Sequence, residues 1–276
     1  MPCMTRPTTN AGDSAMTPIR LFVGAAANDC DLESQMVLEY SLAKHASEPF
    51  QITWMQQAAT GPYAGWKCGS GRTPFTHFRW SIPAMCGYEG RGIYTDSDFI
   101  FMADIAELWH QPIPNVLLTK VGKKGLHKTC CMLFECAKAK GHVPDLDTLR
   151  AMDDPQGTMV QYFKQHPELY SGFAGDWNAI DLKGYDSVDD PRIKAIHYSR
   201  MEMQPQLKYA LPRLQREGKS HWWTAAHGPH ERLELITLFD ALYAEAQVAG
   251  YTLNQYRTTP FDGATRRNFA YTHSRV

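Results

Sequence analysis

Two aspartates separated by one residue, Asp96 and Asp98, follow a short apolar run that begins at Gly92. Side chains along a strand alternate between its two faces, so acids at this spacing point the same way while the strand continues. Where the strand ends, both carboxylates can converge on one hard cation at its mouth. Oxygen ligands of this kind suit Mg²⁺ or Mn²⁺, which keep waters and take further ligands from a diphosphate. The pair therefore indicates a nucleotide-sugar site.

An Asp-x-Asp pair also occurs as a turn at a strand end or as a helix N-cap, and these structural uses explain most chance occurrences. The context here favours a ligand site. The pair lies near the middle of the chain, and a helical pattern begins just beyond it, at Asp104. In an open α/β sheet, ligands bind outside the carboxyl ends of the strands, where both acids are expected.

The elements that must position these acids begin near the N-terminus. Ile19–Val23 has the apolar character of a buried strand, and Gly24 begins a turn in which backbone can approach a ligand closely. Asp31 is expected to cap a helix that runs to about His45. Gln51–Met55 has the pattern of a second strand. This strand–helix–strand opening favours a parallel sheet with right-handed crossovers.

The rest of the chain continues to alternate between the two kinds of element. Further strands are expected at Val116–Lys120, Cys131–Glu135 and Ala195–Tyr198. Helices are expected at Phe75–Met85, Leu146–Met152, Val160–Gln165 and Glu231–Ala249. Loops are expected at Gly61–Pro74 and Ser171–Asp190. Without an internal repeat or a long linker, the pattern predicts one α/β domain over 18–250, with a flexible leader at 1–17 and a basic tail at 251–276.

Composition excludes several classes of protein. The 276 residues are 43% hydrophobic and 21% charged, with a formal net charge of -1, which argues against a dedicated nucleic-acid binder. No apolar segment approaches the ~20 residues of a membrane-spanning helix, and the leader lacks the apolar core of a secretory signal. The arginines of the basic tail allow at most a peripheral contact with an anionic membrane surface. We expect a cytoplasmic protein, at most in contact with the inner face of the membrane.

The seven cysteines are scattered, and none forms a CxxC pair. This spacing argues against a closed zinc site, and reduced thiols fit a cytoplasmic compartment. Cys130, Cys131 and Cys136 lie in an apolar run, where thiols behave as small hydrophobic side chains.

Several segments together resemble the donor-binding half of family 8 glycosyltransferases and their bacterial relatives. They follow the family's order from Ile19 to about Pro205. The segments are Phe75-Thr-His-Phe-Arg-Trp-Ser-Ile-Pro83, Gly87-Tyr-Glu-Gly90, Ile93-Tyr-Thr-Asp-Ser-Asp98, Asp104-Ile-Ala-Glu-Leu-Trp109, Cys131-Met-Leu-Phe-Glu-Cys136, Asp176-Trp-Asn178 and Lys194-Ala-Ile-His-Tyr198.

The resemblance implies a GT-A-type, Rossmann-like fold with a mixed, mostly parallel sheet flanked by helices. It also implies a UDP-sugar donor, Mn²⁺ (or Mg²⁺) and transfer with retention of anomeric configuration. Asp96 and Asp98 match the metal-binding pair, with Ser97 between them beside the donor, and His197 matches the third metal ligand. Arg79 matches a basic residue that contacts the donor; with Asp98 it is the catalytic candidate. A metal and a guanidinium both suit a leaving diphosphate.

Other matched positions are expected to hold the donor. Val23 and Gly24 match the strand end that holds the nucleotide, and Trp177 and Asn178 match a loop that lines the sugar and acceptor side. Two departures follow. The first turn lacks the family's usual Asp or Arg, so Asn28 or Asp29 is expected in that role. The segment after His197 lacks the family's Gly and its phosphate-binding Lys, and Arg200 and Lys208 are the candidates to replace that charge.

We therefore expect a glycosyltransferase that moves a hexose from a UDP-sugar to a glycan or lipid-linked acceptor, in polysaccharide biosynthesis. The altered segment after the histidine keeps a non-catalytic nucleotide-sugar-binding protein open as an alternative. A metal-dependent nucleotidyltransferase-like enzyme with a similar sheet is the other.

Overall fold

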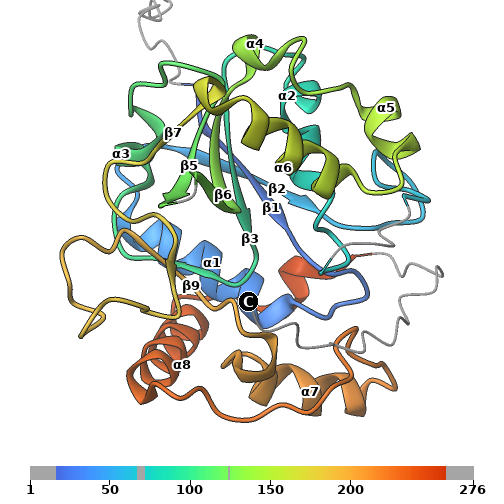
Figure 1. Cartoon of the computed structure of the whole chain (residues 1–276). Coiled ribbons are helices and arrows are strands. Elements are labelled where there is room, and N and C mark those ends of the chain that lie inside the picture. Colours follow the sequence, from blue (N-terminus) through green and yellow to red (C-terminus); the bar gives the residue numbers. More distant parts are fainter. Residues whose placement is uncertain (1–16, 67–71, 124, 259–276) are drawn as a thin grey trace, which may run out of the picture.

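The computed structural model describes residues 17–66, 72–123 and 125–258. Its centre is a six-stranded sheet with strand order β2-β1-β3-β6-β5-β7 (Figure 1). The strands are β1 (Ile19–Gly24), β2 (Phe50–Met55), β3 (Arg91–Asp96), β5 (Leu117–Gly122), β6 (Gly125–Glu135) and β7 (Tyr170–Gly172). β1 pairs in parallel with both β2 and β3, as the opening of the sequence predicts. Only β6 runs against the others, so the sheet is mixed and mostly parallel.

A second, three-stranded sheet begins just beyond the carboxyl end of β3. It has the order β4-β9-β8, with β4 at Phe99–Phe101, β8 at Ala179–Ile180 and β9 at Ala195–His197. The register of the antiparallel β4–β9 pair places Phe99 opposite His197. β4 begins three residues after β3 ends at Asp96. The pairing of β4 with β9 therefore places His197 close to Asp96 and Asp98, although it lies about a hundred residues later in the chain.

Helices cover both faces of the central sheet (Figure 1). The helices on one side are α2 (Ile82–Met85), α4 (Cys136–Ala139), α5 (Leu146–Ala151) and α6 (Pro155–Gln165). Those on the other side and below it are α1 (Leu32–His45), α3 (Ile105–Trp109), α7 (Leu207–Arg216) and α8 (Leu233–Val248). Short 3₁₀ turns occur at Phe78–Ser81, Pro167–Leu169, Met201–Met203 and Leu253–Tyr256. In the part of the chain that the structure describes, no helix combines the length and apolar character needed to cross a membrane.

Three expectations about local structure are wrong in whole or in part. The helix predicted from Phe75 is a 3₁₀ turn followed by the short α2, because Pro83 has no N–H to bond to the preceding turn. Asp31 is the N-cap residue of α1, as expected, but its side chain makes no capping hydrogen bond; its carboxylate accepts from the backbone N–H of Ala26 at 2.7 Å instead. The loop expected over Ser171–Asp190 contains the end of β7 and all of β8.

Part of the predicted basic tail packs against the domain. Tyr256 is buried, and its ring lies edge-on to Trp54 at 5.7 Å. Arg257 pairs with Glu217 at 2.6 Å and with Asp29 at 2.7 Å, so its charge is used inside the molecule. The other tail arginines lie outside the residues that the structure describes, and the membrane contact gains no support.

Candidate metal and donor site

Asp96 ends β3 with its side chain almost fully buried. Its Oδ1 atom accepts hydrogen bonds from Arg79 at 3.0 Å and from the hydroxyl of Tyr94 at 2.5 Å. A buried carboxylate needs such partners, because leaving it unpaired costs several kcal/mol. Oδ1 is thus occupied by two donors, and the second oxygen remains for a further ligand.

Arg79 is held as firmly as the acid it faces. Its guanidinium donates to the backbone of Thr76 at 2.9 Å and of Thr129 at 2.6 Å, besides Asp96. It also lies over the ring of Tyr94, 4.7 Å from the centroid. These contacts fix the position of the Arg79 guanidinium at the end of β3, where it neutralises part of the negative charge of the aspartates.

Asp98 lies two residues further on, at the start of the small sheet. One oxygen, Oδ2, accepts from the side-chain amide of Gln204 at 2.6 Å. The other, Oδ1, is buried, accepts no hydrogen bond from any residue that the structure describes, and lies 3.4 Å from Nε2 of His197. Burial, followed by the neighbouring carboxylates of Asp96 and Asp31, raises the pKa of Asp98 well above its usual value. A cation at this point would relieve that repulsion.

His197 ends β9 and is buried, with its ring stacked on Phe99 at 4.5 Å. Burial, followed by the charges of Lys128 and Arg79, lowers its pKa well below the usual value, so the imidazole is neutral. Its Nδ1 lies 3.0 Å from Oδ1 of Asn178, which can only accept. The proton therefore belongs on Nδ1, and the lone pair of Nε2 faces Asp98 as a metal ligand requires.

A cavity of about 980 Å³ opens in front of these side chains. Its walls include both aspartates, His197 and Arg79. Six of the residues that line it are cationic and four are acidic, which leaves a positive excess suited to a diphosphate. Lys128, Lys164 and Lys183 line it without forming an ion pair to another described residue. The site therefore combines hard metal ligands with unpaired positive charge.

Sequence reasoning missed Cys130. Its sulfur, a carboxylate oxygen of Asp96 and a ring nitrogen of His197 all lie within 4.8 Å of one another. The thiol also lines the cavity, whereas Cys131 and Cys136 are fully buried in the core, as expected. Burial, followed by the charge of Asp96, raises the pKa of Cys130 to about 12, so the thiol is protonated at neutral pH. Strand alternation could have identified this residue: if Cys131 faces the core, the side chain of Cys130 must point to the opposite face of the strand.

The residues expected to hold the nucleotide lie in β1 and in the turn that follows it. Val23 is fully buried, and the carbonyl of Gly24 accepts from the backbone N–H of Ser97 at 2.8 Å. A side chain at Gly24 would collide with the ring of Phe75, so this position needs glycine for packing. Asn28 has a φ of 59° in the turn before α1. None of these predicted donor residues lines the cavity.

The loop expected to line the sugar divides into two roles. Trp177 is fully buried, and its ring N–H donates to the carbonyl of Ala174 at 3.1 Å. Asn178 is also fully buried, and it positions the imidazole described above. Asp176 accepts from Lys120 at 2.7 Å, which holds this loop against β5. The structure thus brings Asn178 to the site and places the tryptophan in the core.

The two candidates for the missing phosphate charge differ in position. Arg200 lines the cavity but pairs with Glu231 at 2.9 Å and with Glu202 at 3.2 Å. Lys208 pairs with Asp240 and is not among the residues that line the cavity. Lys183 was not among the residues predicted from the sequence. It lines the cavity and forms no ion pair with another described residue, so it resembles the family's phosphate-binding lysine more closely than Arg200 or Lys208 does.

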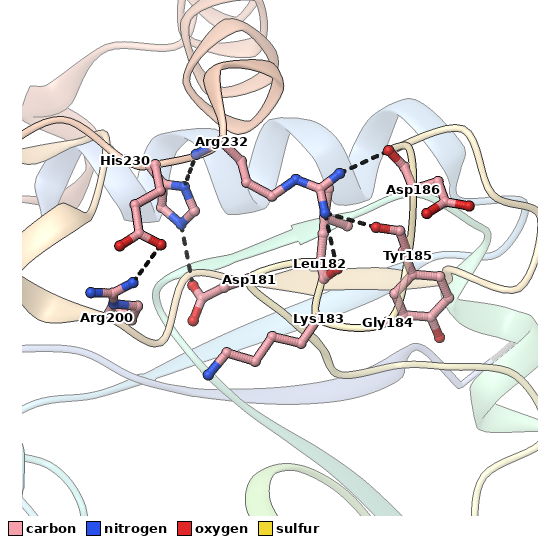
Figure 2. A pocket seen from close by; sticks show the side chains of 10 residues that line it. Asp181, Leu182, Lys183, Gly184, Tyr185, Asp186, Arg200, His230 and Arg232 are labelled. Atoms are coloured by element: carbon pink, nitrogen blue, oxygen red, sulfur yellow. Dashed lines mark hydrogen bonds and ion pairs between the residues drawn. The ribbon is translucent and has the colours of Figure 1, made fainter.

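A smaller cavity of about 410 Å³ adjoins the first and shares Lys183 and Arg200 with it. Figure 2 shows its loop, in which Asp181 and Leu182 both have positive φ, at 46° and 53°. Asp181 faces the buried His230 at 3.5 Å. Strained non-glycine backbone of this kind persists only where the surroundings impose it.

Comparison with solved structures identifies the architecture. The chain matches the apo form of the glycosyltransferase GlyE of Streptococcus pneumoniae TIGR4 over 87% of its own length and 63% of that chain, with 15% identity and a TM-score of 0.54. It matches the galactosyltransferase LgtC, solved with donor and acceptor sugar analogs, over 82% of its own length and 96% of that chain, with 12% identity and a TM-score of 0.50. The fold is of the GT-A type.

A third GT-A match, the bifunctional glycosyltransferase WbbM, covers 70% of this chain and 48% of that one, with 14% identity and a TM-score of 0.50. Among curated proteins, Protein CDI of Arabidopsis thaliana is 35% identical over 104 residues. That match covers 37% of this chain and 39% of the relative, so the chain spans about two fifths of that protein. No protein-family model matches the chain.

Proposed function

We propose that the chain is a metal-dependent, retaining glycosyltransferase similar to family 8, which moves a hexose from a UDP-sugar to a glycan or lipid-linked acceptor. The observation that carries the proposal is the meeting of Asp98 and His197 at 3.4 Å, across 99 residues of sequence, at the mouth of a cavity. The proposal is supported by the position of this cavity at the carboxyl end of β3, because ligands bind outside the carboxyl ends of the strands in open α/β sheets. We assign residues 18–250 to the glycosyltransferase domain.

The donor set fits Mn²⁺ or Mg²⁺. Asp96, Asp98 and His197 would supply two carboxylates and one imidazole, leaving other coordination positions to water and a diphosphate. The buried oxygen of Asp98 without a hydrogen bond is the observation that favours a cation here. A bound divalent ion would stabilise the negative charge that develops on the leaving diphosphate. Asn178 holds the imidazole in the tautomer that this role requires.

The chain's own cations would share the work of holding the diphosphate. Lys128 on β6 and Lys183 beyond β8 both line the cavity, and neither forms an ion pair with another residue that the structure describes. We assign them the role of the lysine that the family carries after its histidine. Arg79 positions Asp96 through their ion pair, and the backbone carbonyls of Thr76 and Thr129 hold its guanidinium in place.

A non-catalytic nucleotide-sugar-binding protein is the second candidate. The observation that favours it is the pairing of Arg200, the cation that follows His197 most closely, with two glutamates. Such a protein would bind UDP and the metal in the same cavity without releasing product.

The test is incubation of the full chain with each common UDP-sugar and Mn²⁺, following UDP release and, by calorimetry, UDP binding. Release that requires Mn²⁺ and is lost in Asp98→Ala supports the enzyme. Tight UDP binding without release across acceptor pools supports the binding protein. Release of pyrophosphate would point to nucleotidyl transfer, and absence of both binding and release would remove the proposal. Asp147→Ala, which changes an exposed acid on α5, is the matched control.

A further inference from the structure

The strand β6 is irregular where it passes the candidate site. Its register with β5 moves from Thr119 opposite Met132 to Lys120 opposite Lys128 in one step of β5. Residues 129–131 of β6 therefore have no partner in the β5 register. The hydroxyl of Thr119 lies 2.9 Å from the carbonyl of Lys128 and 3.1 Å from that of Cys131, so it ties the two ends of this bulge together. Bulges beside active sites commonly re-aim a side chain.

This part of β6 lines the cavity with Lys128, Thr129 and Cys130, and of these only Cys130 carries a thiol. On the other edge of β6, Cys131 pairs with Thr95 of β3 and is fully buried. The β3–β6 register ends at this pair; Asp96 and Cys130 are the next residues on the two strands, and a carboxylate oxygen of Asp96 lies within 4.8 Å of the Cys130 sulfur. Alternation then turns the Cys130 sulfur to the face of the sheet that Asp96 occupies, away from that of Cys131.

The resulting cluster has three different donor atoms. The Cys130 sulfur, an oxygen of Asp96 and a nitrogen of His197 lie within 4.8 Å of one another. Ligands around a tetrahedral Zn²⁺ lie roughly 3.3–3.8 Å apart, given metal–ligand bonds of about 2.0–2.3 Å. Small rotations of the side chains would therefore close these three atoms around one ion.

The choice of metal follows from the donors. Mn²⁺ and Mg²⁺ prefer oxygen and accept imidazole, but thiolate selects softer ions, and Zn²⁺ is bound by sulfur, nitrogen and carboxylate alike. Asp98 offers a fourth ligand, because its Oδ1 is already 3.4 Å from Nε2 of His197. Four protein ligands would complete a tetrahedral shell and leave no position for a diphosphate.

We propose that Cys130, Asp96 and His197 form a binding site for Zn²⁺ that overlaps the Mn²⁺ site of the proposed function. On binding, the thiol of Cys130 loses its proton to solvent as the zinc–sulfur bond forms, so uptake releases protons. Zn²⁺ then displaces Mn²⁺ and closes the site to the donor. The competition rests on the proposed function, whereas the zinc site stands on its own geometry.

The test uses Co²⁺ as a spectroscopic substitute for Zn²⁺ with the full chain and without any nucleotide. The expected result is a thiolate-to-cobalt charge-transfer band that Zn²⁺ removes by competition. The band should be absent from Cys130→Ser, and the Zn²⁺ affinity of that variant should fall by about 100-fold or more. Its Mn²⁺ affinity should change by less than about 3-fold, since sulfur is not a preferred ligand of that ion.

Cys86→Ser is the matched thiol control, because Cys86 lies beside Cys136 on the α2–α4 side and does not line the cavity. It should keep the cobalt band. Absence of the band in the unaltered chain, or its persistence in Cys130→Ser, would overturn the zinc site. If that variant does not fold, protection of the unaltered chain decides: Zn²⁺ must shield Cys130 from alkylation, and unshielded labelling refutes the proposal. UDP release with Mn²⁺ is measured separately, so failure of the enzyme and failure of the zinc site are distinguishable.

Discussion

Asn178→Ala is the sharpest test of how the imidazole is positioned. Asn178 and His197 are both buried, and the 3.0 Å contact between Oδ1 and Nδ1 involves the only donor that the neutral ring carries. Removing the acceptor leaves a buried N–H unsatisfied, which costs about 1–3 kcal/mol of folding free energy. It also lets the ring rotate or change tautomer. Partners of this kind typically contribute about 10–100-fold to metal affinity.

The assay is calorimetric Mn²⁺ titration in the presence of UDP, with thermal unfolding of the same samples. Asn178→Ala should bind Mn²⁺ about 10–100-fold more weakly than the unaltered chain. Asn178→Asp keeps an acceptor at the same place, so it should retain the affinity. If Asn178→Ala binds Mn²⁺ as tightly as the unaltered chain, or if both variants lose binding equally, the amide does not hold the imidazole as a ligand.

Three further outcomes follow from the contacts. Lys128→Met should weaken UDP binding about 3–10-fold and flatten its salt dependence, whereas Lys208→Met should leave it unchanged, as measured by titration at two ionic strengths. Arg79→Met strips a buried carboxylate of its cation and should cost about 3–5 kcal/mol of stability in denaturant unfolding; a loss below about 1 kcal/mol would refute that role. The Arg257 ion pair, the first cause, depresses the pKa of Glu217 to about 2, so its stabilisation is present above pH 4.5 and disappears as pH falls toward 2. Glu217→Gln should remove about 1 kcal/mol or less at neutral pH, and this difference should vanish in acid unfolding curves.

The local pattern of apolar, polar and turn residues was sufficient to predict most strands of the central sheet. The strand β1, the helix α1 and the strand β2 follow from apolar periodicity and turn residues, because these signals act within a few residues. The helix expected from Phe75 failed for an equally local reason, since Pro83 interrupts the hydrogen-bond ladder.

Sequence motifs predicted some residues of the candidate site and missed others. Asp96, Asp98 and His197 came from spacing and from a family resemblance, and Arg79 was expected to contact the donor. In the fold Arg79 lines the cavity, and its guanidinium also binds Asp96 and two backbone carbonyls, which the sequence did not indicate. Cys130 escaped notice because it begins an apolar run and its orientation depends on a bulge whose register is set by another strand.

The amino-acid sequence by itself determined most of the segments that become strands and helices and which acids end a strand, because these depend on near neighbours in the chain. Tertiary structure alone decided which charges meet. The pairing of β4 with β9 joins Asp98 to His197, and the pairing of β3 with β6 brings Cys130 beside Asp96. Lys183 faces the cavity while Lys208 pairs with Asp240 outside it. Such choices depend on contacts between distant residues, and no local propensity encodes them.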